Sequence, residues 1–467
     1  MEMQSKVMAA AAGGDRLSDL PDSLLTHILS KLWEAKQVVR TCVLSRRWRY
    51  FWMSVPPSLD FNFPYTEDQN VTLDYIAFIH RELYYWRSCH KIRKFRVWGL
   101  RHEEHYANDV DLWVHFATKL AKVEEFLLGF FYLDHRIRYE FPQFAYKNAF
   151  LRRLAIWHCQ LNPFGSINWS GLVSLSIGYV EFTDGLKEKV LSGCPNLECL
   201  ELNSVSGVHP LVLSSAKMRR LSISDYYDEN HDRCLEIIAP YIQDLYISGL
   251  CSGIRIGQRN MASLVTVMLH LEFDFLDQQR TLEKESGYLK ELLQSVAHAE
   301  NLKLGNWCIE CLSILELKGW QFPPSSCKFL DLAVGLEQLD FHGICSFLQS
   351  SLDLETLVIE WYDNRERELL SRFIDEDEQT RRFEMYDFNG SFPHLKTIKF
   401  LNFYGSVLPL VKYLLKHAIV LEEFVIDAAT EESDVSPGYV FPDYVKMAQE
   451  FLSLTRSSPH ASVIFSY

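Results

Sequence analysis

The chain has 467 residues, a formal net charge of −14 and a pI of about 5.6. This length suits two or three domains or one elongated repeat array, and a hydrophobic content of 48% is typical of a well-packed globular protein. Nucleic acids and anionic membranes bind basic surfaces, so the acidic balance disfavours a general binder of either.

Residues 1–14 are small and polar, and they contain no sustained apolar run that resembles a signal peptide. We expect this segment to be a flexible tail. No stretch elsewhere approaches the apolar length that a membrane span requires. The eleven cysteines are scattered, some of them inside apolar segments, as Cys159 and Cys199 are. Without a secretory signal, we expect reduced, buried thiols and a protein of the cytoplasm or nucleus.

Two amphipathic helical patterns follow the tail. Asp19 and Pro21 stand where a helix begins, as a capping side chain and a proline of the first turn. Leu44, Trp48 and Trp52 step by four and would share one face of a second helix. A segment of under about forty residues cannot bury a full core of its own. Its apolar surface therefore needs cover, either from the rest of this chain or from a second protein.

The Leu20-Pro21 start and the run from Thr41 to Arg49 make this segment similar to the F-box. The F-box binds the Skp1 adaptor of cullin-RING ubiquitin ligases, and the end of this run resembles the plant form of the motif. The resemblance places an F-box at residues 15–62 and implies a Skp1-like partner and, through it, cullin and RING subunits. The residues that it implies for Skp1 binding are Leu20, Pro21, Leu24, Leu25, Ile28, Leu29, Leu32, Val39, Leu44, Trp48 and Trp52. The family usually has proline after Leu32, where this chain has Trp33.

A repeating unit of the form apolar-x-x-apolar-x-apolar dominates residues 63–390. Its inner alternation predicts a strand, so that Leu197, Leu200 and Leu202 should point into one core. The central copies start roughly 21 to 25 residues apart, which is the spacing of leucine-rich repeats. The copies, two of which lie beyond residue 390, begin at Ile92, Val123, Leu151, Leu172, Leu197, Met218, Ile242, Leu264, Cys327, Leu354, Leu395 and Leu421.

A single repeat cannot bury its apolar face, but stacked neighbours can. We therefore expect an α/β fold in which F-box helices precede a degenerate leucine-rich-repeat solenoid, with an ordinary parallel α/β domain as the alternative. The interval with Leu186 and Val190 suits a helix on the convex side of the strands. A longer interval predicts a helix with Leu289 and Val296 on one face, as an insertion or an enlarged repeat. The dense mixed charge near 364–384 predicts a mobile loop, with partner docking as a lesser alternative.

Residues 391–467 resemble the FBD region at the C-terminus of many plant F-box proteins. The sequence from Leu395 predicts two strands flanking a helix, with Leu410, Leu414 and Leu415 facing inward. The segment ends on a strand-like stretch from Ala461 to Phe465. We expect a β-α-β cap of the FBD type that covers the end of the solenoid, the part that terminal repeats play.

Motifs of catalysis are weak. Cys308 and Cys311 form a single CxxC without a second pair at zinc-finger spacing, and we expect them to pack beside a strand. His102 and His105 lack the glutamate of HExxH. No phosphate-binding glycine loop and no G-x-S-x-G motif occur. The sequence indicates no cofactor and no metal.

The resemblance implies a substrate-recruiting adaptor of an SCF ubiquitin ligase, which performs no bond chemistry itself. The alternative is a Skp1-associated scaffold that does not promote degradation. The expected concave strand positions mix aromatic and polar residues, which suits protein recognition; they are Trp157, His158, Tyr179, Asp225 and Tyr246. The target protein is not indicated.

Overall fold

The computed structural model describes residues 17–29, 37, 40–51, 57–66, 68–87, 92–101, 103–131, 138–226, 235–250, 253–256, 261–272, 282–334, 341–361, 391–403, 408–428 and 444–466. The chain forms two compact units. Unit 1 comprises Met1–Val180 with Glu188–Leu197, and unit 2 comprises Glu181–Lys187 with Glu198–Tyr467. The expected tail at 1–14 and the expected charged loop near 364–384 lie outside the described residues.

The described residues at the start of unit 1 include α1 (Asp22–Leu29), the 3-10 turn η1 (Thr41–Val43) and α3 (Trp48–Phe51). Helix α1 begins directly after Pro21, as the sequence predicts. The expected single helix face of Leu44 and Trp48 is wrong, because the chain turns between η1 and α3. Leu44 is exposed, whereas Trp48 is buried.

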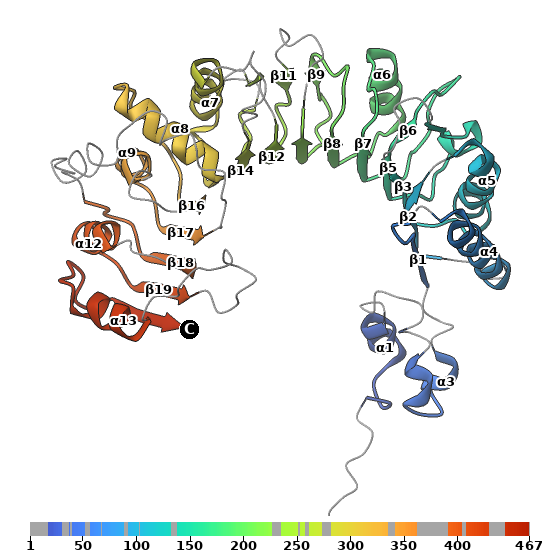
Figure 1. Ribbon diagram of the computed structural model, residues 1–467, viewed down its shortest axis with the longest axis horizontal. Helices are drawn as coiled ribbons and strands as arrows, with labels where there is room; N and C mark the ends of the chain where they lie inside the picture. Colours follow the sequence, from blue (N-terminus) through green and yellow to red (C-terminus); the bar gives the residue numbers. More distant parts are fainter. Residues whose placement is uncertain are drawn as a thin grey trace, which may run out of the picture. The chain divides into compact units, whose positions relative to one another are not determined.

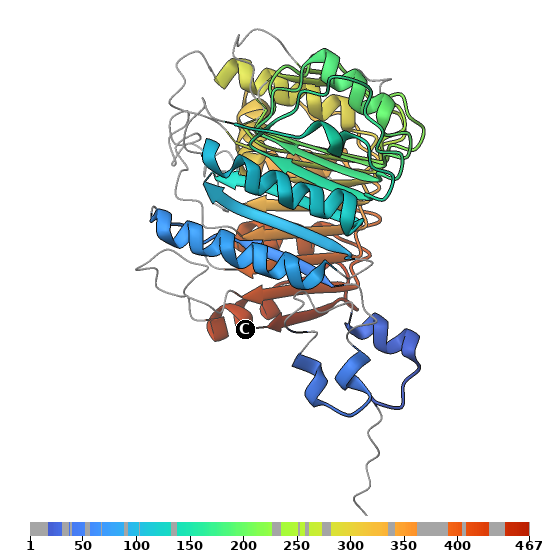
Figure 2. The same cartoon turned by 90° about the vertical axis from the view of Figure 1, so that its right-hand side faces the viewer.

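The rest of unit 1 is a parallel sheet in the order β1 (Ser58–Asn62), β2 (Lys94–Arg101), β3 (Glu125–Phe131), β5 (Arg153–Trp157) and β7 (Ser174–Gly178). One face is covered by α4 (Gln69–Trp86) and by α5 (Ala107–His115), which continues into the π turn η4 (Phe116–Leu120). Figure 2 shows α4 running alongside β2. Phe61 of β1 contacts Phe78 of α4 edge-on, with ring centroids 6.1 Å apart. Shorter elements complete the unit: η3 (Glu104–Tyr106), β4 (Tyr139–Glu140), η5 (Gln143–Tyr146) and β6 (Cys159–Gln160).

Helix α6 (Asp184–Gly193) contributes residues to both units and buries Leu186 and Val190, as expected. Unit 2 is a longer parallel sheet, again in sequence order: β8 (Cys199–Asn203), β10 (Arg220–Ser224), β12 (Asp244–Gly249), β14 (Thr266–Leu271), β15 (Asn301–Leu304), β16 (Phe329–Val334), β17 (Thr356–Trp361), β18 (Thr397–Phe403), β19 (Glu423–Ala428) and β20 (Ser462–Ser466).

The layer behind this sheet changes character along unit 2 (Figure 1). It begins as a small parallel sheet of β9 (Leu211–Val212), β11 (Leu235–Ile238) and β13 (Ile254–Ile256). It continues as helices, namely α7 (Leu282–Val296), α8 (Asn306–Leu317), α9 (Phe341–Ser350), α12 (Leu408–His417) and α13 (Tyr444–Ser453). Leu289 and Val296 of α7 are buried, which confirms the predicted inward face.

Equivalent side chains of successive strands stack in rows. The register pairs Leu200 with Leu221, Leu221 with Leu245 and Leu245 with Val267, and all four side chains are buried. Each such side chain contributes about 1.5–3 kcal/mol on burial. Because successive described strands of each sheet pair side by side, the apolar row of one repeat is continued by that of its neighbour, and both are covered by the layer behind the sheet. The expected α/β solenoid is therefore confirmed.

Several strands end in a residue with a left-handed backbone. His158, Tyr179, Ser204 and Asp225 have φ between 46 and 57°. The backbone N–H of His158 donates to Gly178 O at 2.9 Å, so the turn is tied to the next strand. The expectation of strand positions at 158, 179 and 225 is wrong, because this turn ends each strand. Trp157 and Tyr246 do lie within strands, as expected.

At the C-terminus, β18, α12 and β19 form the predicted strand-helix-strand unit. Leu410, Leu414 and Leu415 are buried, as expected. Strand β20 pairs with β19 and ends the sheet order. Among the described helices, none is long and apolar enough to cross a membrane.

Candidate functional site

The described residues 17–29 and 40–51, here called the N-terminal module, have a small apolar core of their own. Leu25, Leu29 and Trp48 are buried together, with Leu20 and Phe51 packed at the edge. The Trp48 and Phe51 rings meet edge-on at 6.4 Å between centroids. Because Leu25 and Leu29 lie one turn apart on α1, they present one face of the helix to Trp48.

Ser18 is the polar centre that holds α3 against α1. Its hydroxyl lies 2.8 Å from the Ser45 hydroxyl and accepts a hydrogen bond from Trp48 Nε1 at 3.1 Å. Arg47 donates to the backbone carbonyl of Ser18 and also pairs with the Asp22 carboxylate at the start of α1. These bonds turn the chain after Leu44, which is why Trp48 packs inward while Leu44 does not.

The face of α1 that adjoins this buried one carries exposed apolar side chains. Leu24 is 50% exposed and Ile28 is 39% exposed, and the two lie one helical turn apart. Leu44 is 56% exposed beyond η1. Leu17 and Val43 are also exposed apolar residues of the module. Single exposed apolar residues are ordinary, but this many in so small a module mark an interaction surface.

The residues that the F-box resemblance implies for Skp1 binding therefore fall into separate groups. Leu25, Leu29 and Trp48 lie in the module's core, and Leu20 packs at its edge. Leu24, Ile28, Leu44 and Pro21 are exposed. Leu32, Val39 and Trp52 lie outside the described residues. Leu17 and Val43 were absent from that set; the apolar character of Val43 within the second pattern is the signal that could have included it.

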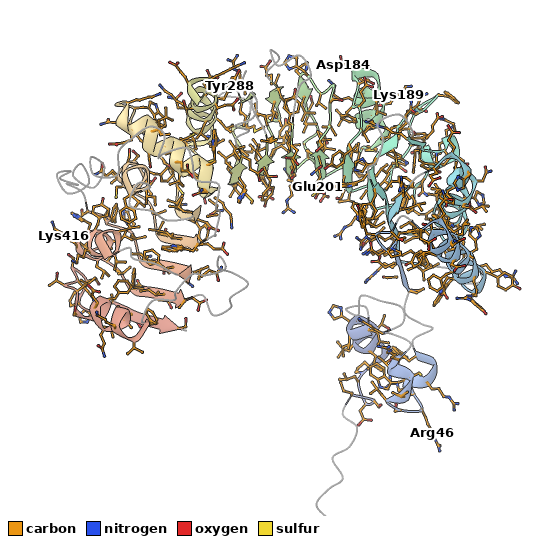
Figure 3. All side chains as sticks on the ribbon, viewed as in Figure 1. Arg46, Asp184, Lys189, Glu201, Tyr288 and Lys416 are labelled. Atoms are coloured by element: carbon orange, nitrogen blue, oxygen red, sulfur yellow. The ribbon has the colours of Figure 1, made fainter. Side chains whose placement is uncertain are left out.

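The repeat units present a second kind of surface, the face of each sheet that bears no helices. In Figure 3, Glu201 of β8 projects from this helix-free face, whereas Tyr288 and Lys416 lie on helices of the other side. In unit 2 the helix-free face carries paired charges. Arg220 lies 3.2 Å from Asp244 and 5.5 Å from the ring centroid of Tyr246. Such a mixture of charge and aromatic surface is typical of protein recognition.

The CxxC pair is packed in the interior of unit 2. Cys308 and Cys311 are buried on α8, and the Cys308 thiol points to Leu269 O of strand β14 at 3.5 Å, as expected for packing beside a strand. Burial raises the pKa of the Cys308 thiol to about 12 and that of Cys311 well above its ordinary value. Neither thiol ionises at neutral pH. Within the described residues, no three His, Cys, Asp or Glu side chains come together as metal ligands would.

Comparison with known proteins gives two family matches. The F-box domain matches residues 17–59, and the family described as At1g61320/AtMIF1, LRR domain, matches residues 87–450. F-box/LRR-repeat protein At3g03360 of Arabidopsis thaliana is 30% identical over 74% of this chain and 70% of the relative. F-box protein At5g03100 of the same plant is 31% identical over 68% of this chain and 97% of the relative.

The leucine-rich-repeat match covers most of the chain and extends into the region with the FBD resemblance, so the FBD assignment of residues 391–467 stays a prediction. The F-box match falls on the N-terminal module and the repeat match on the sheets of both units. This chain belongs to the plant F-box/LRR-repeat proteins.

Proposed function

We propose that this chain is the substrate receptor of an SCF-type ubiquitin ligase. Its F-box binds a Skp1-like adaptor, and its repeats bind a target protein. One observation supports the binding of a Skp1-like adaptor. The N-terminal module forms a core with Leu25 and Trp48. It still leaves Leu24, Ile28 and Leu44 exposed. A large part of each of these three side chains stays exposed in the folded module, and burying it against a partner is favourable.

The proposed mechanism is proximity. Holding a target and a ubiquitin-conjugating subunit in one complex makes their encounter effectively intramolecular, at concentrations that reach millimolar for short flexible links. The chain itself binds and orients, and the cullin and RING subunits supply the chemistry. Such a receptor works in the cytoplasm or nucleus.

Within this proposal the Skp1 contacts are the exposed members of the predicted set, joined by Val43; they are Pro21, Leu24, Ile28 and Leu44. The buried members, Leu25, Leu29 and Trp48, hold α1 and α3 in place so that the contacts are presented together. Arg47 supports the same arrangement through its pairing with Asp22.

The test is co-purification with Skp1 after co-expression of the full chain. The double variant Leu24→Ala/Ile28→Ala should lose Skp1, because one apolar anchor commonly costs about 2 kcal/mol of binding, roughly a 30-fold loss of affinity. The matched control is Leu112→Ala/Leu120→Ala, since these leucines are 58% and 57% exposed in α5 and η4. Wild-type recovery of Skp1 with the α1 variant would refute the proposal.

The claim that the bound target is ubiquitinated and degraded needs a separate measurement, because a Skp1-bound scaffold would use the same surfaces. Target proteins found by proximity labelling under proteasome inhibition should live longer in cells that lack this chain. The Leu24→Ala/Ile28→Ala variant should fail to restore their turnover, whereas the Leu112→Ala/Leu120→Ala control should restore it. Unchanged half-lives in all cases would favour the scaffold.

A further inference from the structure

Four aromatic rings gather at the carboxyl ends of the strands of unit 1. Trp98 of β2 and Trp157 of β5 meet edge-on, with ring centroids 5.3 Å apart. Tyr179 follows β7, and its ring lies 6.0 Å from that of Trp157. His158 stacks on Tyr179 at 3.9 Å, with an angle of 13° between the rings. We call these four residues the aromatic cluster.

Two glycines make room for the indoles. A Cβ at Gly129 would lie 2.3 Å from the Trp98 ring, and a Cβ at Gly178 would lie 2.7 Å from the Trp157 ring. Gly129 is on β3, opposite Trp98 on one side and Trp157 on the other in the strand register. The indoles therefore pack against the strand backbone at Gly129 and Gly178, where the side chain of any other residue would displace them. The position of both rings on this face is thus fixed by the strands beneath them.

The left-handed turns complete the cluster. His158 and Tyr179 have φ of 57 and 55°, a conformation that costs an ordinary residue energy and that glycine adopts more easily. Both turns nevertheless carry ring side chains, and these rings stack on each other. Burial and the nearby Arg138 lower the pKa of His158 to about 4, so the imidazole is neutral at neutral pH.

The cluster is partly open to solvent. Tyr179 is 37% exposed, and Trp98 and Trp157 are half-buried among the described residues. Tryptophan and tyrosine supply large, rigid contact areas with a polar tip, and they dominate the binding energy of protein interfaces. Rings held down on backbone lose little conformational freedom when a partner covers them, which favours tight binding.

The surroundings of the cluster are basic, in contrast to the chain as a whole. On the helix-free rows of strands β1, β2, β3, β5 and β7 the charged residues are Lys94, Arg96, Arg101 and Arg153 against Asp60 and Glu125, four cations minus two anions, or +2. The whole chain carries −14. Arg96 lies 5.5 Å from the Trp98 ring centroid.

The ion pairs on this face are of the kind that a partner can replace. Arg96 and Lys94 share Asp60 at 3.4 and 3.6 Å, and Arg153 lies 3.8 Å from Glu125 with most of its side chain exposed. Solvent-exposed pairs contribute about 0–1 kcal/mol each, and the Arg153–Glu125 pair is the more exposed of these. The guanidinium groups of Arg96 and Arg153 can therefore turn to the carboxylates of a bound peptide. An arginine holds a carboxylate by two parallel hydrogen bonds.

We infer that the aromatic cluster and its basic rim bind an extended acidic segment of the target protein, anchored by one aromatic or proline side chain. The inference rests on the proposed function, because it names the chemistry of the target that the receptor recruits. The anchor stacks on Trp98, Trp157 and Tyr179, and acidic residues on either side of it pair with Arg96 and Arg153.

The test uses the full chain bound to Skp1 and a random dodecapeptide library displayed on phage. Selected peptides should carry Asp or Glu beside a Trp, Tyr, Phe or Pro, and their affinity should fall as salt is raised. Gly129→Ala, which displaces the Trp98 indole, should weaken the selected peptides at least about 10-fold. Gly165→Ala is the matched control, because a Cβ there meets nothing within 4 Å; it should bind as wild type.

A second variant, Trp98→Ala/Trp157→Ala, removes the anchoring rings without adding an atom and should abolish selection. Both variants should still co-purify with Skp1, so loss of peptide binding is separate from failure of the proposed function. Selection of basic peptides, no selection, or peptides that bind Gly129→Ala as well as wild type would each overturn the inference.

Discussion

Substitution of two adjacent leucines of α1 should have different effects, one on the folding of the F-box and the other on its binding to Skp1. Leu25 is fully buried, so Leu25→Ala removes a core side chain and should cost about 2–5 kcal/mol of local stability. Leu24 is 50% exposed, so Leu24→Ala loses at most about half of a burial contribution of 1.5–3 kcal/mol, which is about 1 kcal/mol.

The assay has two readouts on the full chain. Hydrogen exchange of the α1 amides measures the free energy of opening the module, and titration calorimetry measures Skp1 affinity. Leu25→Ala should speed α1 exchange by roughly 30-fold or more, the equivalent of about 2 kcal/mol. Leu24→Ala should leave exchange within about 5-fold of wild type and still weaken Skp1 by roughly 10-fold or more.

The reasoning fails if the two substitutions behave alike in both readouts. It fails equally if Leu24→Ala increases the opening of α1 more than Leu25→Ala does, since Leu24 would then be the core residue and Leu25 the exposed one. Wild-type Skp1 affinity in Leu24→Ala would remove the exposed face of α1 from the proposed interface.

Three further outcomes are expected. Ser18→Ala removes the acceptor of Trp48 Nε1 and should cost about 1 kcal/mol of α1 opening, seen by hydrogen exchange. In an NMR titration His158 should have a pKa of about 4, rising in Arg138→Ala; because this folded pKa lies below the ordinary 6.5, stability of unit 1 should fall as pH falls from about 6.5 to about 4. Cys308, with a thiol pKa of about 12, should resist maleimide at pH 8 in the folded chain and react after denaturation, as mass spectrometry would show.

The local pattern of the sequence determines much of this protein. The alternation around Leu200 and Leu202 predicts which side chains are buried, because a strand sends successive residues to opposite faces and only one face of a stacked repeat is covered. Helical spacing likewise predicts α1 and the inward faces of α7 and α12. The F-box itself could be identified because its residues are close together in the chain.

Tertiary contacts decide which side chains are exposed or buried where the spacing of residues does not predict it. Leu44 and Trp48 stand at helical spacing, yet the bonds of Ser18 to Ser45 and Trp48 turn the chain between them, so one is exposed and the other is buried. For the same reason the split of the adjacent Leu24 and Leu25 into surface and core depends on where Trp48 packs.

The aromatic cluster shows the same limit in the repeats. Trp98, Gly129 and Trp157 belong to different repeats, and no pattern within one repeat indicates that they meet. The parallel register of β2, β3 and β5 brings them together, and the missing side chain of Gly129 lets the indole of Trp98 lie flat. The sequence by itself determined which residues each repeat buries, because burial follows a period of two along the chain. Only the stacking of repeats decided which exposed residues become neighbours, because that depends on register between strands far apart in sequence.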